Sequence, residues 1–254
     1  MKSKKGSHVG MVLSFVIFVI FIFFIYLVTQ PAIKTESKSN SLEYLADNLQ
    51  KQVSSNVTSA AISLQNSQSC VILSGFLSTV NIGNSFKVGN YSGKQVQAQV
   101  SSNDLVLVRD TNDFFFNVYG SSAFPNATTG TPGSCQVLNR GGGYEIGLVK
   151  TDKIVVEPLI ANLIVSYASN YNGIKSTLQV SQVNEFDFSF TYSNGTTVYA
   201  TNPNLMIPNG TNVYAKNSPI TYISNNGALE PGMLNVRMWR CLMIRYKKEI
   251  GLKR

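Results

Sequence analysis

The N-terminal part of the chain is dominated by one apolar run. Residues 9–28 contain no charged side chain. At about 1.5 Å per residue, a helix of this length covers about 30 Å, the thickness of the hydrocarbon core of a bilayer. The run is longer than the apolar core of a cleaved secretory peptide, and the following Thr29-Gln30-Pro31 is no small-residue cleavage site. We therefore predict a retained transmembrane helix over residues 9–28.

A second helical pattern follows within residues 31–56. Asn40-Ser41-Leu42-Glu43 has the form of a capping box, and apolar residues then recur at helical spacing at Leu42, Leu45, Leu49 and Val53. The pattern predicts a stalk helix after Pro31. Its apolar stripe is expected to pack either on the head of its own chain or on a neighbouring copy.

Strand patterns replace the helical ones from residue 57 onward. Apolar residues alternate with polar ones, and clusters of Gly, Asn and Ser separate the segments, as short antiparallel connections require. Residues 120–143 are rich in Gly, Pro and Thr and are expected to form a long loop. The predicted strands lie in residues 57–64, 70–77, 96–100, 105–109, 114–119, 144–150, 153–156, 186–190 and 197–200.

One helix interrupts the strands. Pro158 suits a first helical turn, and the apolar face that follows consists of Leu159, Leu163, Tyr167, Tyr171, Ile174 and Leu178. Asn172-Gly173 is expected to kink or end this helix. The fold class predicted is α+β: a transmembrane helix, then a mainly antiparallel β head domain over residues 57–236, with one packed helix near 158–178.

The last segment, residues 237–254, is predicted to be a basic amphipathic tail. As a helix it places its apolar side chains on one arc and most of its basic ones away from it. Such a helix could lie on an anionic membrane surface or bind a partner; packing on its own domain and disorder are the alternatives. The candidate contacts with a membrane surface are Trp239, Arg240, Arg245, Lys247 and Lys248.

The net charge of +8 does not indicate a nucleic-acid binder. Ten of the 21 basic residues lie in the two tails, before residue 6 or after residue 236. Residues 6–236, between the two tails, contain 11 basic and 12 acidic residues. The domain is therefore nearly neutral and has no basic stripe for phosphates. We therefore expect no nucleic-acid partner.

Common catalytic and metal-binding patterns are missing from the sequence. His8 is the only histidine and lies beside the apolar run, so the head contains neither a Ser-His-Asp triad nor a histidine metal site. Glu185 and Asp187 are predicted on the solvated face of their strand, opposite three phenylalanines. Residues 110–113 lack the remaining ligands of a calcium loop. We expect no catalytic residue, metal or cofactor, and we keep a carboxylate enzyme as the alternative.

Two kinds of modification site are candidates for an extracellular head. Cys70 and Cys135 could form a disulfide outside the cytoplasm, or they could be buried reduced thiols. Asn-x-Ser/Thr sequons occur about as often as the composition alone would produce. They begin at Asn56, Asn90, Asn126, Asn194 and Asn209.

The N-terminus resembles the class III leader of archaeal type IV pilins and pilin-like proteins, because Lys4-Lys5-Gly6 directly precedes the apolar run. The resemblance implies cleavage between Gly6 and Ser7, a retained helix that forms a filament core, and a β-rich head. Met11 departs from the bacterial pattern, where a glutamate is usual. Residues 144–192 are similar to a segment of uncharacterised single-pass membrane proteins of archaea, which implies no activity.

Together these patterns predict a cell-envelope protein that acts by assembly or adhesion and not by catalysis. Its expected partners are the lipid bilayer and its own copies or other envelope proteins; a solitary surface receptor is a further alternative. Lysines before the apolar run favour a cytoplasmic N-terminus and a head outside the cell. A chain that starts near residue 57 is expected to be monomeric and folded.

Overall fold

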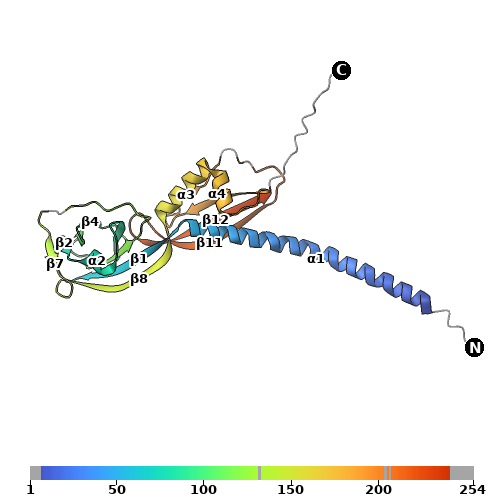
Figure 1. The fold of residues 1–254 in the computed structure, drawn as a ribbon, viewed down its shortest axis with the longest axis horizontal. Helices are drawn as coiled ribbons and strands as arrows, with labels where there is room; N and C mark the ends of the chain where they lie inside the picture. Colours follow the sequence, from blue (N-terminus) through green and yellow to red (C-terminus); the bar gives the residue numbers. More distant parts are fainter. Residues whose placement is uncertain (1–6, 131–132, 203–204, 206, 241–254) are drawn as a thin grey trace, which may run out of the picture.

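The computed structural model describes residues 7–130, 133–202, 205 and 207–240, without the side chains of residues 7–9 and 29–39. One long N-terminal helix projects from an elongated, mostly β head (Figure 1). Twelve strands and three shorter helices form the described part of the head. The predicted order, an apolar helix followed by a mostly β domain with few helices, is confirmed.

Helix α1 spans Ser7–Gln52 without interruption. It continues through Pro31, although proline has no N–H and removes one hydrogen bond from the helix. The predicted stalk helix is four residues too long, since β1 begins at Ser54. The change occurs at Val53, whose N–H donates to the Leu49 carbonyl in the helix (3.2 Å) and whose carbonyl accepts from Val156 in the sheet (3.0 Å).

The larger sheet has eight strands in the order β10-β9-β12-β11-β8-β1-β6-β3. Neighbours are antiparallel except β11 and β8, which are parallel and pair through only two residues each. The strands are β1 (Ser54–Leu64), β3 (Phe86–Asn90), β6 (Phe115–Gly120), β8 (Tyr144–Val156), β9 (Asn184–Thr191), β10 (Thr197–Tyr199), β11 (Val213–Ile223) and β12 (Leu229–Arg240).

The smaller sheet has the order β4-β5-β2-β7, with β2 and β7 parallel. Its strands and the short helix beside it are β2 (Cys70–Leu73), β4 (Gln97–Ser101), β5 (Asp104–Val108), β7 (Gln136–Leu138) and α2 (Phe76–Val80). Strand β7 lies within the segment that was predicted to be loop throughout.

The head contains two main hydrophobic cores, which define two lobes. The distal lobe, residues 54–156, buries its core between the smaller sheet and strands β1, β3 and β6. The proximal lobe combines residues 40–53 with residues 157–240. Figure 1 shows α1 leaving the proximal lobe at the end opposite the distal lobe. A small third cluster, including Val57, Val156 and Ile223, lies where the lobes meet.

The predicted helix near 158–178 is two helices, α3 (Glu157–Ser169) and α4 (Tyr171–Thr177). The break falls at Asn170, two residues before the predicted Asn172-Gly173. Asn170 leaves helical geometry (φ −140°, ψ 55°), and its side chain accepts a hydrogen bond from the Gly173 N–H, which caps α4. The apolar face itself is as predicted, with Leu163, Tyr167 and Leu178 buried.

Helices α1, α3 and α4 pack on one face of the proximal sheet. This face carries the three phenylalanines of β9, Phe186, Phe188 and Phe190, all buried as their alternation predicts. The β9–β10 hairpin turns at Asn194-Gly195, also as predicted, with Gly195 in the left-handed region (φ 81°).

The C-terminal prediction is wrong for residues 237–240. These residues continue β12 and pair with β9, so the described part of the predicted tail is strand. Trp239 is only 3% exposed and cannot contact a membrane surface, whereas Arg240 is exposed at the end of the strand. Met238 is buried in the proximal core, and Trp239, on the opposite face of the strand, is buried as well. Arg245, Lys247, Lys248 and Cys241 lie outside the described residues.

The turn after β5 is organised by a buried arginine. The Arg109 side chain is 7% exposed. One terminal nitrogen donates to the carbonyls of Asp110 (3.2 Å), Thr111 (3.3 Å) and Asp113 (2.5 Å), and the other donates to the carbonyl (2.6 Å) and side-chain oxygen (2.9 Å) of Asn66. The turn that superficially resembles a calcium loop therefore directs its carbonyls at a guanidinium group.

Two glycines make a close contact between the lobes. A side chain on Gly89 of β3 would overlap the carbonyl of Gly227, which lies in the left-handed region (φ 76°) at the β11–β12 turn. We predict that Gly89→Ala lowers the free energy of unfolding by about 1–3 kcal/mol, because neither backbone can yield freely. Urea denaturation measures this loss. Gly83→Ala, where the added methyl meets open space, is the control and should change stability much less.

Candidate functional site: the exposed half of helix α1

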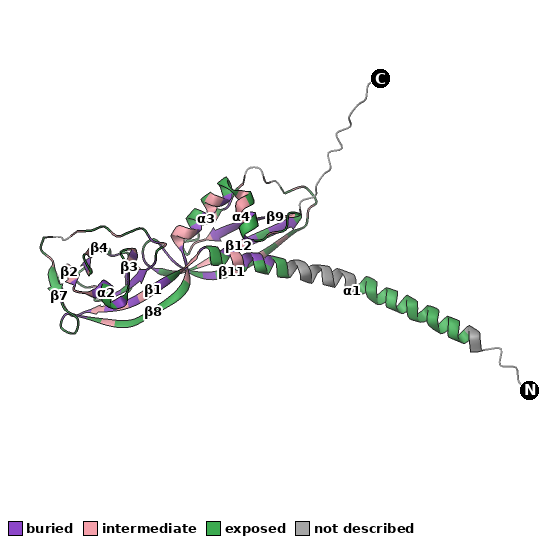
Figure 2. Cartoon of the chain, in the orientation of Figure 1, coloured by how far each residue is buried: buried purple, intermediate pink, exposed green. Residues whose placement is uncertain are grey.

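The N-terminal half of α1 is apolar, and no part of the head packs against it. Residues 10–28 form one candidate membrane-spanning segment, and none of them is buried in the head. The large apolar side chains of residues 11–28 are 41–70% exposed. Figure 2 shows this half exposed and the end of the helix partly buried where it meets the head.

This exposure is too large for a helix surrounded by water. Full burial of one Val, Leu, Ile, Phe or Met side chain stabilises by about 1.5–3 kcal/mol, so the whole segment loses on the order of tens of kcal/mol in water. Segment length and lack of charge match the hydrocarbon core of a bilayer. The segment could therefore cross a membrane, where lipid or other apolar helices would cover it.

The C-terminal end of α1 is part of the proximal core. Leu42, Leu45, Leu49 and Val53, the predicted stripe, are each 5% exposed or less, as is Ala46. The stripe therefore packs on the head of its own chain, which was one of its two predicted partners. The stripe is buried and offers no apolar surface to a neighbouring copy, whereas the large apolar side chains of residues 11–28 are exposed.

Two polar contacts supplement this packing. Glu43 forms an ion pair with Lys216 of β11 (2.8 Å), and the Tyr44 hydroxyl donates to the side chain of Gln179 (2.7 Å). The hydrogen bond from Lys216 and its positive charge lower the pKa of the Glu43 carboxyl. Both contacts lie at the protein surface, where such pairs contribute little to stability. Their main effect is to fix the orientation of the helix on the sheet, and the apolar packing supplies most of the stability.

The carboxylates of the alternative enzyme hypothesis have cationic partners. Glu185 pairs with the buried Lys175 of α4 (2.9 Å) and accepts a hydrogen bond from the Tyr171 hydroxyl. Burial, together with that hydrogen bond, raises the pKa of Tyr171. Asp187 binds Arg237 through both carboxylate oxygens (2.7 and 2.5 Å), which raises the pKa of Arg237.

These carboxylates are less solvated than predicted. The side chains of Glu185 and Asp187 are each only 18% exposed, because Tyr171 and Lys175 reach one of them and Arg237 covers the other. They bind different cations, Lys175 and Arg237. No group of three or more His, Cys, Asp or Glu within the described residues could hold a metal ion.

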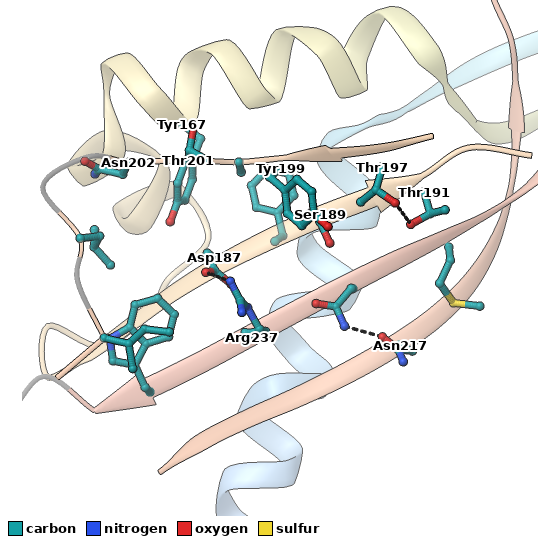
Figure 3. A pocket seen from close by; sticks show the side chains of 17 residues that line it. Tyr167, Asp187, Ser189, Thr191, Thr197, Tyr199, Thr201, Asn202, Asn217 and Arg237 are labelled. Atoms are coloured by element: carbon teal, nitrogen blue, oxygen red, sulfur yellow. Dashed lines mark hydrogen bonds and ion pairs between the residues drawn. The ribbon is translucent and has the colours of Figure 1, made fainter. Parts of the chain in front are cut away.

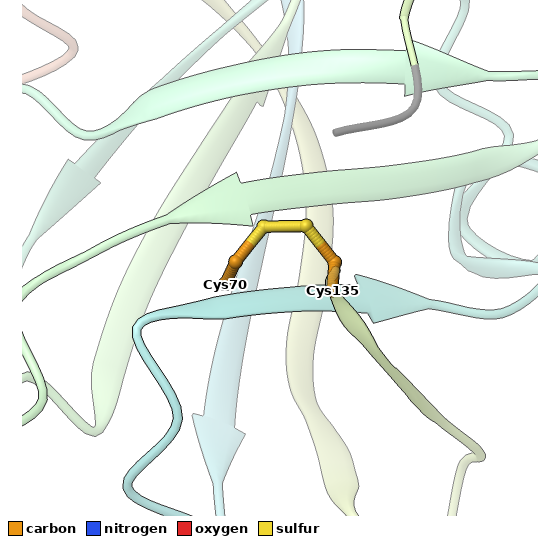
Figure 4. The surroundings of a disulfide bond; sticks show 2 residues. All are labelled: Cys70 and Cys135. Atoms are coloured by element: carbon orange, nitrogen blue, oxygen red, sulfur yellow. A yellow bond between two sulfur atoms is a disulfide. The ribbon is translucent and has the colours of Figure 1, made fainter. Parts of the chain in front are cut away.

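Cys70 and Cys135 are joined by a disulfide bond (Figure 4). Cys70 begins β2, and Cys135 directly precedes the parallel neighbour β7, so strand pairing brings their Cα atoms to 4.7 Å. This separation is within the range that a disulfide requires. The bridge attaches the segment before β7 to the distal lobe.

We predict that removing this bridge destabilises the distal lobe. It closes a loop with a sequence separation of 65 residues, for which chain entropy gives about 4 kcal/mol. The double variant Cys70→Ser/Cys135→Ser should therefore unfold at a markedly lower urea concentration. Cys241→Ser leaves the bridge intact and serves as control. Equal midpoints for the double variant and the parent protein would show that the bridge contributes no stability.

The sequons differ in exposure. Four of the asparagines, Asn56, Asn126, Asn194 and Asn209, are exposed and stay candidates for glycosylation. Asn90 is only 7% exposed, and its amide donates to Asp113 (2.9 Å). This burial disfavours a glycan on Asn90 in the folded chain, and the predicted modification stays a prediction. Of the predicted leader site, Gly6 lies outside the described residues and Ser7 is the first residue of α1.

A scan of family models and searches of curated proteins and of solved structures return no match to this chain. The site is therefore interpreted from its own geometry.

The sequence did not predict either ion pair of β9. Asp187 and Arg237 face each other across β9 and β12, 50 residues apart in sequence, and only the strand register brings them together.

Proposed function

We propose that this protein is a membrane-anchored subunit of the cell envelope that assembles with its own copies through the exposed half of α1. The observation that carries the proposal is the division of one continuous helix. Its last turns are buried in the head, whereas residues 10–28 are apolar and uncovered. A rigid connection of this kind places the head at a fixed position relative to whatever surrounds the apolar segment.

The arrangement supports the pilin-like interpretation of the leader. In that family an apolar helix forms the filament core and carries a β-rich head. Here α1 joins such a head by packing on β11 and β12 of an antiparallel sheet. The lysines ahead of the helix, Lys2, Lys4 and Lys5, favour a cytoplasmic N-terminus, and the bridge between Cys70 and Cys135 suits an oxidising exterior.

A non-catalytic role is supported by the paired carboxylates. A carboxylate that acts as a catalytic acid or base must be within hydrogen-bond reach of the proton that it transfers. Glu185 and Asp187 instead neutralise Lys175 and Arg237. The enzyme alternative would therefore require one of these ion pairs to open.

Assembly is tested by cross-linking in detergent. We predict that the full chain forms dimers and larger species, because residues 10–28 present apolar surface all round the helix. A chain beginning at residue 40 keeps the proximal core, lacks this surface and should stay monomeric. If the full chain stays monomeric at high concentration, the helix only anchors the head and does not drive assembly. Equal association of the shortened chain would place assembly in the head.

Topology and processing need separate measurements. Protease added to intact cells should remove the head; protection until the membrane is opened would reverse the orientation. Mass spectrometry of the mature N-terminus shows whether the leader is cleaved after Gly6. A chain that begins at Ser7 would support the pilin-like class, and an intact Met1 would remove that part of the proposal.

A further inference from the structure

A groove of about 610 Å³ lies on the proximal sheet (Figure 3). Tyr167 of α3 and Phe188 contribute to its edge, whereas most of the β9 and β12 residues that line it are on the sheet face away from the covering helices. Its floor is formed by alternate residues of β9 and β12, including Ser189, Asn235 and Trp239, which point away from the helix-covered face. One wall is formed by Tyr199 of β10 and by the described residues after it that line the groove, Ala200, Thr201, Asn202, Leu205 and Ile207. The volume is typical of sites for small ligands. Nothing in the proposed assembly through α1 uses this face.

The described residues that line the groove carry no net charge. Among the described residues that line it, only Asp187 and Arg237 are charged, and they bind each other through two hydrogen bonds (2.7 and 2.5 Å). The Asp187 carboxylate would repel an anionic ligand, and the Arg237 guanidinium would repel a cationic one. The pair can still offer planar hydrogen-bonding edges to a neutral ligand. Charge therefore favours a neutral ligand.

The other polar groups are hydroxyls and amides. Seven lining side chains are Ser, Thr or Asn. Thr191 and Thr197 share a hydrogen bond (2.9 Å), and the Asn235 amide donates to Asn217. Each amide has both donor and acceptor atoms, and each hydroxyl can do either, so the two pairs retain capacity for a ligand. A ligand rich in hydroxyl groups matches such a surface because its own groups also donate and accept.

Aromatic side chains complete the surface. The Tyr199 side chain lies at the wall and is 60% exposed, while Trp239 lies in the floor and is 3% exposed. The C–H faces of a pyranose ring pack against aromatic rings, and its edges carry the hydroxyls. Exposed aromatic surface beside neutral polar groups thus fits both parts of a sugar.

We propose that this groove binds a neutral oligosaccharide, with Tyr199 as the stacking surface and the Asn217–Asn235 and Thr191–Thr197 pairs as hydrogen-bonding groups. This inference goes beyond the proposed assembly and does not depend on it. It would give the head a ligand of its own at the membrane-proximal end of the protein.

The single tryptophan of the chain makes the groove directly observable. Trp239 is the only tryptophan, so intrinsic fluorescence reports this site alone. The full chain, in a zwitterionic detergent without a sugar headgroup, is titrated separately with maltotetraose, cellotetraose and chitotetraose. We expect a saturable change in Trp239 emission with at least one of them. No change with any of the three at 10 mM, roughly the weak end of measurable affinity, would overturn the proposal.

Variants then locate the binding. Tyr199→Ala removes an exposed ring, and Asn235→Ala removes amide groups; each should weaken binding about fivefold or more. Tyr91→Ala is the matched control, since Tyr91 is an 89% exposed tyrosine of the distal lobe. Equal affinity in both groove variants would overturn the assignment. So would a stronger response to a polyanion such as heparin, or to a neutral peptide, than to any of the three sugars.

Discussion

A chain that starts at residue 57 is expected to lose its cooperative fold, whereas a chain that starts at residue 40 keeps it. This corrects the expectation from the sequence, in which the head was complete from residue 57. The shorter chain lacks Leu42, Leu45, Leu49 and Val53, which are buried in the proximal core. Their burial is worth about 1.5–3 kcal/mol each. The sum is comparable with the entire stability of a typical domain, about 5–15 kcal/mol.

Thermal unfolding and near-ultraviolet circular dichroism of both chains test this expectation. The chain from residue 40 should melt in a cooperative transition with tyrosine and tryptophan signals intact. The chain from residue 57 should lose the Trp239 signal in particular, because that residue lies in the lobe that has lost α1. A cooperative transition of equal midpoint in both chains would mean that α1 contributes no stability to the head.

Replacement of Arg109 by methionine is expected to cost about 1–3 kcal/mol or more of stability, because buried acceptors lose a charged donor. Five hydrogen bonds would be lost, four of them to backbone carbonyls, of which that of Asp110 still accepts from the N–H of Asp113. Burial lowers the pKa of Arg109, and the nearby Asp113 and Asp110 oppose this, so the group stays charged at neutral pH.

The matched control is Arg140→Met, which changes an exposed arginine of the same lobe. Chemical denaturation of both variants should show a large shift for Arg109 and a small one for Arg140. Similar midpoints would mean that water replaces the guanidinium without cost. Arg109→Lys separates charge from geometry, because an ammonium group cannot reach both sides of the turn as the planar guanidinium does.

Sequence periodicity predicted the parts of the fold whose signals are local. The uncharged run at residues 9–28, the stripe from Leu42 to Val53 and the alternating phenylalanines of β9 each lie as their spacing indicates. Errors arose where tertiary contacts override local preference. Residues 237–240 read as the start of an amphipathic helix, but pairing with β9 and burial of Trp239 make them strand.

The division into lobes and the groove could not be predicted in this way. Both depend on the order of strands in the larger sheet, where β9 lies beside β12 and β8 beside β1. Residues such as Tyr199 and Asn235 look like ordinary surface positions in isolated strands. The register between segments that are distant in sequence makes them one surface, and a single sequence contains no direct record of that register.

The path of the chain between the lobes determines how the head would carry mechanical tension. The distal lobe is entered through β1 and left through β8, two antiparallel neighbours that run side by side from Ser54 and Val155 at the boundary. A force between a membrane-held α1 and an object attached to the distal lobe would act along these strands. Both strands end at the same boundary, and β8 continues there into α3, which packs in the same core as the end of α1, so the two backbones would share the force. The connection between the lobes is therefore arranged to withstand pulling along the long axis of the protein.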